Sequence, residues 1–98
     1  MSCDPIQADS LEYLPIQIGA DVPLGTQPVE VAILADEDAE PGESDWKPAE
    51  WASDDKTVLI LIGPGGEIEL SRGRWYVYVR IDAPPEKPVI YAGPLTVE

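Results

Sequence analysis

The side chains of this sequence that could most readily do chemistry are carboxylates. The 98-residue sequence has 19 Asp and Glu against six Lys and Arg, a net charge of −13, and nine of the acids lie within residues 36–55. Asp36–Glu40 places oxygens at alternate positions, as an EF-hand calcium loop begins. That loop needs Gly where Pro41 stands and a bidentate Glu where Lys47 stands. The sequence therefore favours a solvated acidic loop, and an isolated calcium site between strands stays open as the alternative.

Catalysis has few other residues to use. The chain has no His, and its one Cys, Cys3, lies near the start of the sequence, so the usual base for a Ser or Cys nucleophile and the ligands of a zinc site are missing. A glycosidase-like carboxylate pair needs a cleft, for which so short a chain has little room. Residues 63–66 lack the Lys-Ser/Thr of a phosphate loop and indicate a hairpin turn. We expect no enzymatic activity, no cofactor and no metal.

The negative charge also limits the class of partner. It opposes contact with nucleic-acid phosphates and with anionic membrane surfaces. The aliphatic run at residues 58–62 is far too short to span a membrane, and the first residues lack the apolar stretch of a signal peptide. We therefore expect a soluble protein, made in a cytosol, whose partners are proteins.

The side chains that would contact such partners need strands to position them. Apolar patterns predict strands at 11–18, 28–35, 57–62, 67–70, 73–81 and 89–97, the last bent at Gly93-Pro94, and no segment of helical length has helical periodicity. Because Pro15 cannot donate a ladder hydrogen bond, we expect the first strand to lie at a sheet edge or to be broken at that residue. The pattern predicts an all-β fold, an immunoglobulin-like antiparallel β-sandwich of about six or seven short strands over residues 10–98, with an N-terminal arm at 1–9. A small barrel is the alternative.

Two tryptophans stand in the acidic segment, in the stretch WKPAEW. Their spacing puts Trp46 and Trp51 on opposite faces if the segment is extended. We expect Trp51 to pack on the sandwich from a short strand at 49–51. We expect Trp46 to lie at the rim, available to a partner.

Residues 73–81 alternate between two faces. One face is apolar and is expected to point into the core; it holds Trp75, Val77, Val79 and Ile81. The other face holds Arg74, Tyr76, Tyr78 and Arg80, and Tyr and Arg are enriched at protein interfaces. The residues predicted to bind a partner are Tyr13, Trp46, Arg74, Tyr76, Tyr78 and Arg80. Two alternatives stay open for the arginines: they meet the acidic loop of a neighbouring copy, forming a ring or lattice, or they pair with acids of the same molecule.

Several stretches carry a resemblance to a known family. These are the DPIQADSLEYLPI segment, PVEVAIL, the DW…AEW loop, the IGPGG turn, the strand GRWYVYVRI and the ending P-E-x-P-V…G-x-L-T-V. Over nearly its whole length the chain resembles small proteins encoded among the structural genes of actinobacterial tailed phages. Its last two strands also resemble the immunoglobulin-like domains of phage baseplate upper proteins.

The resemblance implies a non-enzymatic virion component, assembled in the host cytoplasm. Its partner would be the major capsid protein, as a decoration or minor capsid protein, or a neck or tail protein, bound in several copies. An N-terminal arm, here residues 1–14, would lie along that partner. The face with Arg74, Tyr76, Tyr78 and Arg80, or the WKPAEW loop, would make a second contact. The resemblance leaves the position in the virion open.

Two other functions remain as alternatives. The first is an acidic DNA-mimic inhibitor, against which the acids cluster in a loop rather than at a phosphate-like repeat. The second is a carbohydrate- or host-surface-binding module that uses Trp46, Trp51 and the tyrosines.

Overall fold

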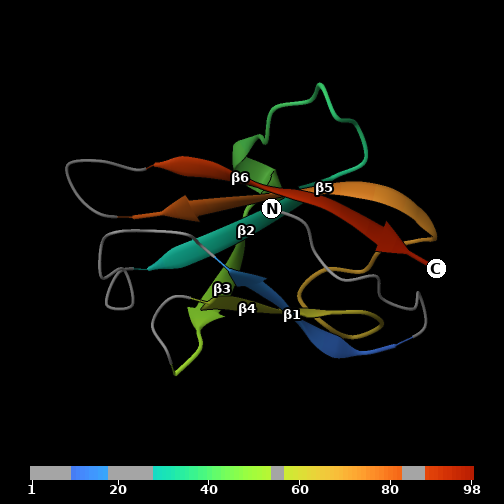
Figure 1. Ribbon diagram of the computed structural model, residues 1–98, viewed down its shortest axis with the longest axis horizontal. Coiled ribbons are helices and arrows are strands. Elements are labelled where there is room, and N and C mark those ends of the chain that lie inside the picture. Colours follow the sequence, from blue (N-terminus) through green and yellow to red (C-terminus); the bar gives the residue numbers. More distant parts are fainter. Residues whose placement is uncertain (1–9, 18–27, 54–56, 83–87) are drawn as a thin grey trace.

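The predicted all-β architecture is confirmed. The computed structural model describes residues 10–17, 28–53, 57–82 and 88–98 (Figure 1). Within them the chain forms six strands and one short 3-10 helix: β1 Glu12–Gln17, β2 Val29–Leu34, η1 Glu43–Asp45, β3 Lys47–Trp51, β4 Thr57–Ile62, β5 Gly73–Ile81 and β6 Val89–Val97. The predicted N-terminal arm lies outside the described residues.

The strands pair as one antiparallel sheet in the order β1-β4-β3-β2-β5-β6, which folds over on itself (Figure 1). One layer holds β1, β4 and β3, and the other holds β2, β5 and β6. Strand β3 joins them, because its first half pairs with β2 and its second half with β4. If the strands are lettered B to G in chain order, the layers read B-E-D and C-F-G, the immunoglobulin order. The shared strand makes the sheet nearly closed, so the predicted sandwich also has a barrel-like character.

The core lies between the two layers and is aliphatic. Alternate residues of β4 and β5 are buried, and the predicted inward face of β5 is confirmed. The buried residues of these two strands are Val58, Ile60, Ile62, Val77, Val79 and Ile81. Trp75 is half-buried and packs against this cluster. Each fully buried side chain of this size contributes about 1.5–3 kcal/mol to folding. The buried side chains of β4, in one layer, and of β5, in the other, therefore stabilise the packing of the two layers.

Two elements differ from the sequence prediction. Residues 67–70 do not form a strand; only an isolated bridge joins Ile68 to Ile62, because the chain turns back tightly and the Gly63 N–H donates to the Ile68 carbonyl at 2.9 Å. Residues 36–55 are less irregular than predicted, since they contain η1 and β3. Strand β3 was anticipated only at its end, because its exposed Lys47 and Pro48 give it a polar, proline-containing pattern.

The turn after β4 brings the chain close to the residues before β1. Gly63 has φ of 126°, and Gly65 has φ of 85°. A Cβ atom at Gly63 would collide with the Ser10 carbonyl oxygen and lie 2.9 Å from the Leu11 Cα atom. Glycine at position 63 is therefore required both by the backbone conformation and by the approach of β1 to β4.

Candidate functional site

The tyrosine–arginine face is the outer surface of the layer β2-β5-β6, formed by Arg74, Tyr76, Tyr78 and Arg80. All four side chains project away from the core, as predicted. Tyr78 lies opposite Tyr91 of β6, and their ring centroids are 5.3 Å apart at an angle of 49°. The face therefore extends across both strands, and Tyr91 belongs to it.

Arg80 links three parts of the chain. Its Nε and NH2 groups donate to Oε1 of Glu30, the residue opposite it on β2, at 3.1 and 2.8 Å. Its NH1 group donates to Oε1 of Glu43 at 3.1 Å. The hydrogen bond to Glu30 is the main cause that raises the pKa of Arg80. Of the two alternatives for the arginines, Arg80 follows the second, because it pairs with acids of its own molecule.

Trp46 does not lie exposed at the rim, and this prediction is wrong. It is only 8% exposed, and the Arg80 guanidinium carbon lies 4.6 Å from its ring centroid, a cation–π contact. Trp51 is half-buried and packs against the core, as predicted. The two rings lie on opposite faces of the sheet, since Trp46 contacts the outward Arg80. A carbohydrate-binding role loses Trp46 as an exposed stacking platform.

An open pocket of about 440 Å³ lies between the tyrosine–arginine face and residues 39–46. Its walls are Ala39, Glu40, Pro41, Glu43, Trp46, Tyr78, Arg80 and Val89. The Tyr78 hydroxyl donates to the Ala39 carbonyl at 3.5 Å, a long hydrogen bond across the pocket. Aromatic and aliphatic side chains thus adjoin two glutamates beside the start of β6. We call this the β6 pocket.

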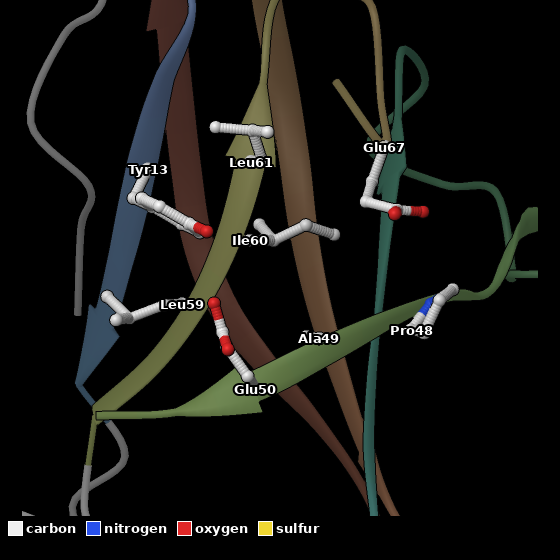
Figure 2. A pocket seen from close by; sticks show the side chains of 8 residues that line it. All are labelled: Tyr13, Pro48, Ala49, Glu50, Leu59, Ile60, Leu61 and Glu67. Carbon is white, nitrogen blue, oxygen red and sulfur yellow. The ribbon is translucent and has the colours of Figure 1, made fainter. Parts of the chain in front are cut away.

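A second pocket, of about 270 Å³, opens on the outer face of the other layer (Figure 2). It is lined by Tyr13, Pro48, Ala49, Glu50, Leu59, Ile60, Leu61 and Glu67. Figure 2 shows the Tyr13 hydroxyl directed toward the Glu50 carboxylate, and the hydrogen bond to Glu50 is the main cause that raises the pKa of Tyr13. Tyr13 is therefore not brought together with the other predicted site residues, which are on β5 or, for Trp46, in contact with Arg80 of β5.

Among the residues that the structure describes, the most exposed large apolar side chains lie at the sheet edges. Among the described residues, four large hydrophobic side chains are 50–54% exposed: Leu11, Tyr13, Val89 and Tyr91. Leu11 and Tyr13 lie at β1 and the other two at β6, the end strands of the sheet. Sequence reasoning missed Val89 and Tyr91. No local sequence signal marks them as exposed, because their exposure follows from the edge position of β6 in the sheet.

The acidic segment forms a turn. The Asp36 carbonyl accepts a hydrogen bond from the Ala39 N–H at 3.2 Å, and the Asp36 carboxylate accepts one from the Asp38 N–H at 3.0 Å. In the described ranges, no group of three or more Asp, Glu, Cys or His side chains could hold a metal ion. Within these same ranges, no helical segment could span a lipid bilayer.

No family model, no curated protein and no solved structure matches this chain.

Proposed function

We propose that this protein is a non-enzymatic structural component of a tailed-phage virion, which binds the major capsid protein or a neck or tail protein in several copies. The observation that carries the proposal is the position of its exposed apolar side chains. Leu11 and Tyr13 lie at one end of the sheet, and Val89 and Tyr91 at the other. Exposed apolar side chains at sheet edges favour contact with other proteins.

The polar groups of the two pockets support a contact surface rather than a reactive one. Arg80 is held by Glu30 and Glu43, and the Tyr13 hydroxyl is held by Glu50. A catalytic acid, base or nucleophile is a group positioned to react with a substrate. Here these groups stabilise the folded chain and fix the shape of its two outer faces.

The two separate edges also suit an assembly of many copies. A protein with one interaction surface forms a pair, whereas a protein with two different interaction surfaces can contact two neighbours and so join a ring or lattice. The resemblance to actinobacterial phage structural proteins, carried by the segments from DPIQADSLEYLPI to the ending P-E-x-P-V…G-x-L-T-V, supports a virion as the setting of such an assembly.

Quantitative mass spectrometry of purified virions tests the proposal. The protein is expected at a fixed ratio to the major capsid protein through successive density gradients. An abundant non-structural protein of the same phage serves as the control for contamination and should fall with each gradient. A protein that is lost in parallel with this control would not be a virion component.

A further inference from the structure

Strand β6 has an open edge without charge. It is the last strand of the sheet, and within the described residues nothing pairs with its outer side. None of its nine residues, Val89–Val97, is charged, in a chain of net charge −13. Natural proteins usually protect an edge strand with charges, proline or a bulge, because its free N–H and C=O groups are a template for another strand.

Those protective features are present elsewhere but not in the first part of β6. The opposite edge, β1, carries Glu12 and Pro15. The second part of β6 has Pro94 and a register shift that leaves Ala92 without a partner on β5. The unprotected part is the segment from Val89 to Tyr91, and two of its three side chains are at least half exposed.

Within this segment, backbone N–H and C=O groups point toward the open edge of the sheet. The Ile81 N–H donates to the Pro88 carbonyl at 3.1 Å, so these two residues form a hydrogen-bonded pair. Antiparallel pairs alternate between bonded and non-bonded positions. Val89, opposite Arg80, and Tyr91, opposite Tyr78, therefore occupy non-bonded positions. Their N–H and C=O groups point away from β5, toward the open edge.

We propose that Val89–Tyr91 accepts an extended strand from a partner protein, and that this strand carries Lys or Arg side chains on its outward face. The occupant is basic because the adjoining β6 pocket bears Glu40 and Glu43, and the Glu43 side chain is 89% exposed. A Lys or Arg in the pocket would lay its aliphatic stem along apolar walls and its charge beside the two carboxylates. A second copy is disfavoured, because it would bring the same acids to the edge.

The identity of the partner as a virion protein rests on the proposed function.

The edge itself is tested with the full chain and two probes, short synthetic peptides that alternate Lys with Val or Glu with Val. We expect the Lys peptide to bind and to shift the backbone amide signals of Val89, Ile90 and Tyr91 in nuclear magnetic resonance spectra. The Glu peptide should not bind.

Three variants separate backbone pairing from charge. Val89→Pro removes an N–H that β5 does not use, and we expect affinity for the Lys peptide to fall about fivefold to tenfold, as for one lost hydrogen bond and a steric block. Val89→Thr keeps the N–H and should bind like the wild type. Val89→Lys keeps the N–H, adds a charge that repels the Lys peptide at an exposed position, and should also weaken binding. This variant replaces Val89→Pro as the test if circular dichroism shows that the proline variant is unfolded.

Several results would overturn the inference. These are no binding of the Lys peptide, equal binding of the Glu peptide, or unchanged binding by both weakening variants. A wild-type dimer in sedimentation that Val89→Pro abolishes would make a second copy the occupant. If this protein binds the Lys peptide at Val89–Tyr91 but is absent from virions, the proposed virion function is wrong and the edge site stands. Presence in virions without such binding would remove the edge site alone.

Discussion

The guanidinium carbon of Arg80 lies 4.6 Å from the centroid of the Trp46 ring. This contact joins β5 to the residue just before β3, and Glu30 and Glu43 both form salt bridges with the same guanidinium. A largely polar segment is thereby fixed over the outer face of β5. Arg80 thereby connects two other residues that line the β6 pocket, Trp46 and Glu43.

Replacing Arg80 with Met should lower the free energy of unfolding by about 1–2 kcal/mol, because a cation–π contact and charge-assisted hydrogen bonds are lost while most of the stem is kept. Urea denaturation of the full chain measures the change. Arg74→Met is the matched control, since Arg74 is exposed and its loss should stay within about 0.5 kcal/mol. Equal losses for the two variants would show that the Arg80 contacts do not contribute.

Replacing Trp46 with Ala should destabilise the fold by about 3 kcal/mol or more, because a large side chain that is 8% exposed leaves a cavity under Arg80. Trp46→Phe keeps an aromatic ring and should lose less than half as much. Urea denaturation again gives the numbers. A loss below about 1 kcal/mol for Trp46→Ala would mean that the ring lies exposed at the rim.

Gly63→Ala should cost about 3 kcal/mol or more, because the methyl group meets the Ser10 carbonyl in addition to the strain of a φ of 126°. Gly65→Ala is the matched control. It has φ of 85° but no atom within 4 Å of the added Cβ, so only the backbone term applies, about 1 kcal/mol. Thermal or urea unfolding that ranked Gly65→Ala as the more damaging change would contradict the close approach of Ser10.

Tyr13 should ionise above its ordinary pKa of 10.0, because its hydroxyl donates to the Glu50 carboxylate. The folded-state pKa is raised, so the stability that this contact contributes is present below pH 10 and is lost as pH rises through the folded-state value. Glu50→Gln should return the pKa toward 10.0 in a titration followed by nuclear magnetic resonance of the tyrosine ring carbons. Glu67→Gln, on the other side of the pocket, should leave it unchanged.

The strands with strong local patterns could be predicted from the sequence. Residues 57–62, 73–81 and 89–97 were each predicted with the bounds that the structure shows, because continuous or alternating apolar residues between turn residues specify buried strands. The outward position of Arg74, Tyr76, Tyr78 and Arg80 followed from the same alternation. Strand β3 was predicted only over residues 49–51, since its pairing with β2 stabilises a first half whose residues Lys47 and Pro48 favour a loop.

The arrangement of the candidate site depended on strand order, which no local pattern records. Trp46 is buried by Arg80, a residue 34 positions away in the sequence. Tyr13 is separated from the other predicted residues because β1 pairs with β4, in the opposite layer. The edge position of β6, and with it the exposure of Val89 and Tyr91, follows only once the order of the whole sheet is known.

The proposed role in virions is tested by the copy number of this protein in particles purified from phage that carry either the wild-type sequence or Val89→Pro. Mass spectrometry scaled to the major capsid protein is the measurement. We expect a fixed copy number for the wild type, in the hundreds for a head protein or about a dozen for a neck or tail ring, and fewer copies of the variant. Intact particles without the wild-type protein would show that it is not a virion component.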